Sequence, residues 1–346
     1  MRILIDINHP AHVHYFRNFY KIMREKGHEI LVVSRNKEIE HKLLEYYKIP
    51  FIDRGKGKEG KFGKFAYMVY ADLKLLKISI GFKPDIFLNF LHPYPSQVAW
   101  FLRKTSLVFS DSEHAKLHHQ LTVPFATQVL TPSCYRIDLG PKHIRFEGYM
   151  ELCYLHPTYY QPNPDILDIL KVKPGERFVI VRFVSWAAAH DFGHLGISLE
   201  NKKKAVKEMS KYARVFISSE KELPDDLKPY QINIPLHKIH DALYFSTLLF
   251  GESGTMTSEA AVLGTSAVFL NNNGLGYTDE EETKYGLVFN YTESEEDQLA
   301  AINKAVEILK NPNLEKENQI KREKLLREKI DTTEFMVKAV EKSQKF

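Results

Sequence analysis

The sequence is poor in the features that mark small secreted or membrane proteins. Its two cysteines, Cys134 and Cys153, are too few for a disulfide framework or a zinc ribbon, and such low usage is typical of the reducing cytoplasm. No apolar run reaches the roughly 20 residues of a membrane span. The first seven residues already contain Asp6 and indicate a short strand, not a signal peptide. We therefore expect a cytoplasmic protein.

The overall composition and length are those of a folded globular protein. The 346 residues are 44% hydrophobic and 27% charged, which is typical of globular proteins and predicts about two domains. Residues 1–160 hold 23 Lys and Arg against 15 Asp and Glu, whereas residues 161–346 hold 25 against 29. This asymmetry either indicates an anionic partner for the first half or is ordinary scatter.

Strands and helices are predicted to alternate along both halves of the chain. Apolar periodicity in the first half predicts strands at 2–7, 29–34, 85–90 and 106–110 and helices at 13–26, 38–48, 62–80 and 95–103. Such alternation favours a parallel sheet covered by helices on both faces.

A proline-rich stretch at 156–164 separates this half from a second one and is predicted to be a linker. Beyond it we expect strands at 178–184, 214–218, 247–250 and 266–270, helices at 202–212 and 257–263, and a helical segment at 294–345 broken at Asn311-Pro312. The chain is thus predicted to form two α/β lobes, 1–160 and 161–330, with a cleft between them.

Ligands of open parallel sheets bind beyond the carboxyl ends of the strands, so the residues there are the candidates. Three histidines, His9, His12 and His14, follow Asn8 after the first strand. Histidine titrates near neutral pH and suits proton transfer. Capping of the next helix, packing on the sheet and a metal site are the alternatives, but the lack of a nearby Cys or carboxylate cluster disfavours metal.

Further polar groups follow the later strands. Asp111, Glu113 and His114 come directly after the strand at 106–110, where one of them is also placed to cap a helix. Arg182 ends the first strand of the second half and suits a phosphate. His190 follows in a loop, where a metal role with His194 is a weak alternative.

The most specific stretch is 251–264, in which a loop of small residues enters a helix. Ser253, Gly254 and Thr255 precede Thr257 and Glu259. Free backbone amides at such a helix start hold diphosphates, and a carboxylate one turn further accepts ribose hydroxyls in other nucleotide sites. The alternative is a plain helix capped by Thr257, with Glu259 countering the dipole.

The segments 253–260 and 263–264 resemble the nucleotide-sugar motif of the GT-B superfamily, and 5–14 resembles its first loop, with His9-Pro10-Ala11 in place of glycines and His12 at the histidine position. The superfamily includes glycosyltransferases and hydrolysing UDP-N-acetylglucosamine 2-epimerases. Over its whole length the chain most resembles an uncharacterised prokaryotic GT-B-like family known only as a domain of unknown function.

The resemblance implies two Rossmann-like lobes, a nucleotide-sugar donor on the second lobe, an acceptor on the first, and a last helix, within 331–346, that packs back on the first lobe. It implies no metal and no cofactor besides the substrate, which we expect to be UDP-linked. Gly254 and Thr255 would contact the diphosphate, Glu259 the ribose, and His12 would be the base. The epimerase pattern of a His and two Arg after the first strand of the second lobe is missing.

Three functions follow as hypotheses. The first is glycosyl transfer to a sugar or lipid-linked acceptor in polysaccharide or glycolipid biosynthesis, with Asp111, Glu113 or His114 orienting His12 or replacing it. The second is a hydrolysing epimerase, and the third a non-catalytic protein that binds sugar nucleotides. No helix-turn-helix, zinc-finger or RNA-recognition signature is present, so we expect no nucleic-acid partner.

The loop 54–64 carries five basic residues and one acidic residue and precedes an apolar stripe that includes Phe65, Tyr67, Met68, Val69 and Tyr70. This pattern suits peripheral contact with an anionic membrane, at its inner face, or with a lipid diphosphate. The alternative is a solvated loop before a core helix.

Overall fold

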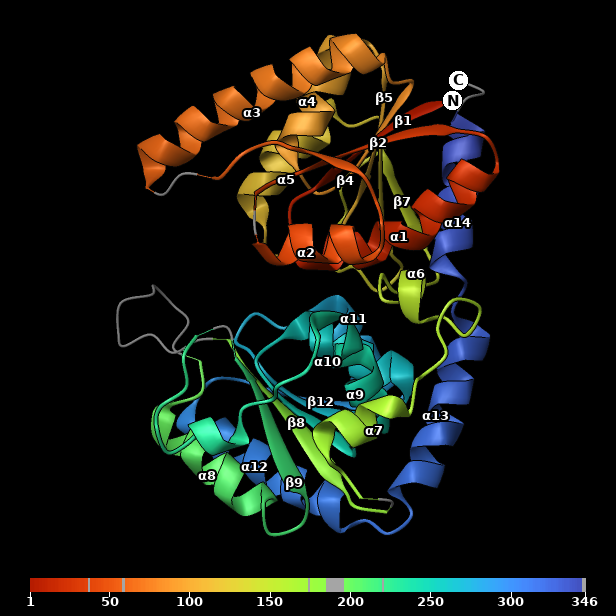
Figure 1. The fold of residues 1–346 in the computed structure, drawn as a ribbon. Helices are drawn as coiled ribbons and strands as arrows, with labels where there is room; N and C mark the ends of the chain where they lie inside the picture. Colours follow the sequence, from red (N-terminus) through yellow and green to blue (C-terminus); the bar gives the residue numbers. More distant parts are fainter. Residues whose placement is uncertain (37, 58–59, 174, 185–195, 220, 344–346) are drawn as a thin grey trace. The chain divides into compact units, whose positions relative to one another are not determined.

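The computed structural model describes residues 1–36, 38–57, 60–173, 175–184, 196–219 and 221–343 (Figure 1). The chain forms two compact units, 1–154 together with 329–346, and 155–328. The first change of unit therefore falls one residue before the proline-rich stretch at 156–164, and the chain returns to unit 1 for its last helix.

Unit 1 is built on a seven-stranded parallel sheet with the order β3-β2-β1-β4-β5-β6-β7. Its strands are β1 (Arg2–Ile7), β2 (Glu29–Ser34), β3 (Phe51–Asp53), β4 (Ile86–Phe90), β5 (Thr105–Phe109), β6 (Gln128–Pro132) and β7 (His143–Phe146). The central strand β1 pairs with both β2 and β4. Its residues from Ile3 onward are buried, which explains its unbroken apolar run.

The helices of unit 1 cover both faces of this sheet. They are α1 (Pro10–Glu25), α2 (Glu38–Tyr46), α3 (Lys61–Phe82), α4 (Pro93–Phe101), α5 (Lys116–Thr122), α6 (Leu152–Leu155, reaching one residue into unit 2) and α14 (Thr332–Lys342). The last helix, α14, packs against α1. The hydroxyls of Thr332 and Thr333 donate to the carbonyls of Tyr149 and Cys153 at 2.8 Å, which fixes its start.

Unit 2 is built on a five-stranded parallel sheet with the order β12-β11-β10-β8-β9. The strands are β8 (Phe178–Phe183), β9 (Arg214–Ser219), β10 (Leu248–Gly251), β11 (Ser266–Leu270) and β12 (Val288–Tyr291). The helices are α7 (Asp165–Leu170), α8 (Leu199–Met209), α9 (Ile239–Phe245), α10 (Gly254–Leu263), α11 (Gly276–Thr283), α12 (Glu295–Lys310) and α13 (Leu314–Glu328). Side chains of β8, β10 and β11 pack with those of α8 and α12 in its core.

The order of the strands locates a ligand-binding edge in each unit. In the first sheet the winding reverses between β1 and β4, and in the second between β8 and β10. The loops beyond the carboxyl ends of strands at such a switch point leave room for a ligand. The described candidate residues at the ends of β1, β8 and β10 therefore lie at or beside a switch point of their own unit.

Most predicted elements are present, and the differences have local causes. The sequence patterns missed β3, β6, β7 and β12, as well as α6, α7, α9 and α11. Helix α10 begins at Gly254 and not near 257, because Ser253 caps it. Among the helices of the described ranges, none is both long and apolar enough to cross a membrane.

Candidate functional site

The loop after β10 is held tightly against β8. Gly251 pairs with Arg182, and a Cβ at position 251 would lie 2.1 Å from the Arg182 carbonyl oxygen. A Cβ at Gly254 would lie 2.4 Å from Leu275 Cδ1 and 2.7 Å from the Tyr277 hydroxyl. Both glycines are thus required by close approach, which brings the start of α10 beside the start of α11.

The start of α10 is an open helix terminus at the switch point of unit 2. Ser253 is its N-cap, and its hydroxyl accepts the amide of Met256 at 3.4 Å. Thr257, which the capping alternative placed as N-cap, instead lies buried inside the helix and donates its hydroxyl to the Ser253 carbonyl at 2.9 Å. The amides of Gly254 and Thr255 occupy the first turn, where helix geometry provides no acceptor within the helix. This end can therefore receive an anion.

Glu259 lies one turn into α10 and pairs with a histidine that the sequence patterns did not single out. Its Oε1 is 2.9 Å from Nε2 of His240, which comes from α9, and both side chains are buried. A carboxylate held in this way keeps one rotamer, which suits recognition of a diol. Its role towards ribose stays a prediction.

Of the other two residues predicted to bind the donor, Arg182 lies at the end of β8. Arg182 donates from Nη1 to the Ser218 hydroxyl at 3.0 Å, which ties it to the end of β9. His190 lies outside the described residues.

Glu252 is a polar residue of the motif that sequence reasoning left without a role. Its buried carboxylate accepts the amides of Val184 at 2.7 Å and Ile197 at 2.6 Å. Its Oε1 also lies 3.5 Å from Nζ of Lys202, which is 1% exposed. One carboxylate thus joins the β10–α10 loop to the end of β8 and to the segment leading into α8. The sequence held one indication of this role, because Glu252 directly follows a predicted strand, in the loop that leads into the next helix.

In unit 1, the start of α1 differs from the start of α10. His9 is the N-cap, and its Nδ1 accepts the amide of Ala11 at 3.2 Å. Pro10 has no amide hydrogen, and the amide of His12 donates to the His9 carbonyl at 3.0 Å. None of positions 10, 11 and 12 therefore has a backbone N–H left for an anion, so the start of α1 is a poor anion site. The alternative that one of the histidines caps the helix is confirmed for His9.

His12 lies in an aromatic cluster at the switch point of unit 1. Its ring centroid is 4.8 Å from that of Phe90 and 6.0 Å from that of Tyr15, with which it stacks. His92 follows β4 nearby, and burial together with the charge of Arg54 holds the pKa of His92 well below its usual range. His92 is consequently neutral at physiological pH.

His14 and Asn8 have other surroundings. The ring of His14 stacks with that of Tyr154 at 5.2 Å and meets that of Tyr47 at 5.8 Å. Because positions 12 and 14 lie about 200° apart around a helix, His14 belongs to a different face of α1. The side chain of Asn8 accepts from Nη2 of Arg54 at 3.0 Å.

The carboxyl groups after β5 are connected to His12 through Tyr15. The Tyr15 hydroxyl lies 3.5 Å from Oδ2 of Asp111, while the Ser112 hydroxyl donates to Oδ1 at 2.9 Å. Burial, and then the neighbouring charge of Glu113, raise the pKa of Asp111 to about 6. Glu113 accepts the amide of Arg136 at 3.3 Å and is buried as well, whereas His114 is exposed. Asp111 and His12 thus both lie against Tyr15, whereas His114 is exposed to solvent.

The raised pKa of Asp111 leads to a stability prediction. Between pH 4 and pH 6 the folded protein retains a proton on Asp111 that the unfolded chain has lost, so wild-type stability falls as the pH rises through this range. We expect Asp111→Asn, which cannot ionise, to raise the free energy of unfolding by about 1–3 kcal/mol at pH 7.5 and to have little effect near pH 4. Urea unfolding at both pH values measures this, and an equal change at both would contradict it.

Arg54, which follows the short strand β3, was counted among the basic residues of the loop 54–64 that suit an anionic membrane, but burial removes it from any such surface. Its side chain is fully buried, with Nη1 3.2 Å from Oδ2 of Asp6 and its guanidinium over the ring of Tyr94 at 4.7 Å. Burial raises the pKa of Asp6 to about 6 although Arg54 opposes this shift. Arg35, after β2, contributes a further cation to the same edge, since it also lowers the pKa of His92. The sequence patterns did not place Arg54 at a strand end, because β3 has only three residues and is too short to recognise.

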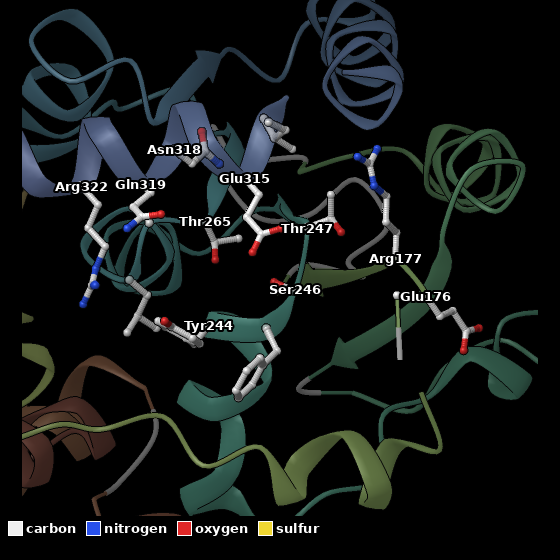
Figure 2. A pocket seen from close by; sticks show the side chains of 15 residues that line it. Glu176, Arg177, Tyr244, Ser246, Thr247, Thr265, Glu315, Asn318, Gln319 and Arg322 are labelled. Atoms are coloured by element: carbon white, nitrogen blue, oxygen red, sulfur yellow. The ribbon is translucent and has the colours of Figure 1, made fainter. Parts of the chain in front are cut away.

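One cavity of about 530 Å³ lies in unit 2, where Leu263 and Gly264 at the far end of the 251–264 stretch line it (Figure 2). Its lining includes Arg177 and Thr265, which directly precede β8 and β11, so it lies at the amino edge of the sheet. Arg177 donates to the carbonyls of Leu309 and Asn311, and Arg322 to that of Val262. Its arginines thus support the fold, and we assign the cavity no role.

Within the described ranges, no group of three or more His, Cys, Asp or Glu side chains is arranged to hold a metal ion. The predicted pair His190 and His194 falls outside those ranges.

Comparison with known proteins agrees with this architecture. An uncharacterised protein of Methanocaldococcus jannaschii is 26% identical over 278 residues, which cover 77% of this chain and 80% of that protein. A UDP-GlcNAc 2-epimerase from Neisseria meningitidis bound to UDP-GlcNAc has a TM-score of 0.65 at 12% identity, over 94% of this chain and 100% of that one. A spinosyn rhamnosyltransferase complexed with spinosyn aglycone has a TM-score of 0.63 at 11% identity, over 99% and 100%.

At these identities the two solved structures show the fold, and they confirm the expected GT-B-like pair of parallel-sheet lobes. They leave the reaction open, since a fold hosts many activities. The sequence profile described as "Protein of unknown function (DUF354)" matches residues 1–345, and the chain therefore belongs to this family.

Proposed function

We propose that this protein transfers a glycosyl group from a UDP-linked sugar to an acceptor hydroxyl. The observation that carries the proposal is the start of α10, where the amides of Gly254 and Thr255 follow the Ser253 cap at a topological switch point. Backbone amides at such a terminus bind diphosphates and stabilise the charge that develops on a diphosphate leaving group.

Unit 2 supplies the other groups needed for the donor. Glu259, oriented by His240 at 2.9 Å, accepts hydroxyls of the ribose. Arg182 at the end of β8 adds positive charge towards the diphosphate. No metal is needed in this scheme, because the helix terminus and the Arg182 guanidinium compensate the negative charge of the diphosphate.

Unit 1 supplies the group that activates the acceptor. His12 removes the proton of an acceptor hydroxyl, whose oxygen attacks the anomeric carbon while the bond between that carbon and the diphosphate breaks. The electron pair of this bond leaves with the diphosphate. Stacking against Tyr15, which contacts Asp111, orients the imidazole. Sugar or lipid-linked acceptors of polysaccharide or glycolipid synthesis in the cytoplasm fit this chemistry.

A hydrolysing epimerase is the second candidate. The observation that favours it is the pair of buried carboxyl groups, Asp111 and Glu113, of which Asp111 has its pKa raised to about 6. A buried carboxyl group with a raised pKa beside a second carboxyl group can supply acid and base to one sugar. Incubation with UDP-N-acetylglucosamine and no acceptor separates the candidates, because only the epimerase forms an epimerised or hydrolysed sugar.

A thermal-shift screen of nucleoside diphosphates and nucleotide sugars tests the proposal. A ligand at 100 times its Kd adds about 2.7 kcal/mol of stability, and we expect UDP and UDP-sugars to reach this value at millimolar concentration. Arg182→Ala should reduce the shift, whereas Arg177→Ala, at the amino end of the same strand, should leave it unchanged after correction for its own stability. Absence of a shift with every nucleoside diphosphate would contradict the proposal, and binding without turnover across a panel of acceptors would indicate a non-catalytic protein.

A further inference from the structure

The outer face of α3 is an exposed apolar stripe. Val69, Tyr70, Leu73 and Ile80 are 44%, 48%, 62% and 61% exposed, respectively. Their spacing places them on one side of the helix, opposite the buried Tyr67, Ala71 and Leu75. α3 lies at the periphery of unit 1, next to α4 (Figure 1).

This face differs from the stripe that the sequence pattern suggested. Tyr67 points inward and donates its hydroxyl to the Gly55 carbonyl at 3.2 Å. Met68 is half-buried. Among the described side chains, the exposed stripe instead runs from Val69 to Ile80, close to the end of the helix, and the side chain of Phe65 lies outside the described ones. A core helix would bury such residues, so the alternative of a plain core helix accounts for only one side of α3.

The neighbouring helix ends in two further exposed aromatic residues. Trp100 and Phe101, the last residues of α4, are 62% and 67% exposed. Arg103 and Lys104 follow after Leu102 and are exposed. Large aromatic residues beside basic ones are typical of the interface between a bilayer and water.

The charge of this region has one dominant sign. Residues 61–104 contain seven Lys and Arg but only two acidic residues, Asp72 and Asp85, and no Glu. Asp85 accepts the amide of Arg2 at 2.8 Å. A second copy of the chain would present the same positive charge, so pairing of two such faces is electrostatically unfavourable, whereas an anionic partner is favoured.

We propose that the α3 face, defined by Val69, Tyr70, Leu73, Lys77 and Ile80, docks on the surface of an anionic lipid bilayer together with Trp100 and Phe101. The apolar side chains enter the region between headgroups and acyl chains, and the lysines contact the lipid phosphates. This surface would hold the protein at a membrane without crossing it.

Co-sedimentation with vesicles of phosphatidylglycerol and phosphatidylcholine tests this proposal with the full-length protein. We expect binding to phosphatidylglycerol vesicles at low salt, and weaker binding to pure phosphatidylcholine or at high salt. Leu73→Glu with Ile80→Glu should lower the partition coefficient about tenfold or more. Lys77→Ala should lower it about fivefold at low salt.

The chain offers a matched control in Ile320→Glu on α13. Ile320 is 60% exposed, close to the 61% of Ile80, but lies in the other unit. It should leave vesicle binding unchanged, and circular dichroism should show all variants folded. Failure of the wild type to bind phosphatidylglycerol vesicles would overturn the proposal, as would equal losses in the α3 and control variants. A wild-type dimer that Leu73→Glu dissociates, without vesicle binding, would make the face a contact between copies and also overturn it.

Discussion

His12→Ala is expected to lower glycosyl transfer by about 10²–10⁴-fold, the usual contribution of a general base, and to leave nucleotide binding nearly unchanged. The physical reason is that His12 lies at the switch point of unit 1 among Phe90 and Tyr15, whereas the proposed diphosphate site belongs to α10 in unit 2. Release of UDP in the presence of an active acceptor measures the rate, and a thermal shift with UDP measures binding.

His114→Ala serves as the matched control for this variant. His114 follows β5 at the same edge of the sheet but is exposed, so its removal should change the rate less than about threefold, well short of a general-base effect. Full activity of His12→Ala would remove His12 from the mechanism. A large loss in His114→Ala alone would transfer the role of base to the group after β5.

Glu252→Ala is expected to destabilise the protein by about 3–5 kcal/mol, because it leaves a buried cation without its carboxylate. The change removes the acceptor for the amides of Val184 and Ile197 and the charge 3.5 Å from Lys202. For a domain of this size the melting temperature should fall by roughly 2–4 °C for each kcal/mol. Differential scanning calorimetry measures the shift.

A double-mutant cycle separates the ion pair from the backbone hydrogen bonds. Lys202 lies over the ring of Phe183 at 5.1 Å, in apolar surroundings that suit a methionine. We expect Lys202→Met to recover part of the loss in the Glu252→Ala background, with a coupling energy of about 1–3 kcal/mol. Strictly additive effects would show that Glu252 acts through the two amides alone.

The elements that sequence patterns found are those with a strong local signal. β1, β2 and β11 have the bounds predicted from their apolar runs. The missed strands are short or carry polar residues: β3 has three residues, and β7, at the edge of its sheet, contains His143 and Arg145. Such segments become strands because a neighbouring strand offers hydrogen-bond partners, which a local pattern does not record.

The same distinction holds for the start of α10. Gly254 and Thr255 have low helix propensity, so the pattern places the start of the helix near 257. The Ser253 cap and the packing of Gly254 against Leu275 move the start forward. This shift matters because it determines which amides are left without an acceptor.

Local chemistry along the chain was enough to establish two α/β lobes, the strand ends that carry polar groups, and a histidine-rich turn in front of α1. Residue type and spacing encode these features directly, because each depends on interactions between near neighbours. The pairing of Glu259 with His240, the anchoring role of Glu252, the burial of Arg54 and the packing of His14 against Tyr154 emerged only on folding. They depend on contacts between residues far apart in the chain, and the environment of a side chain, not its identity, decides its charge and its partners.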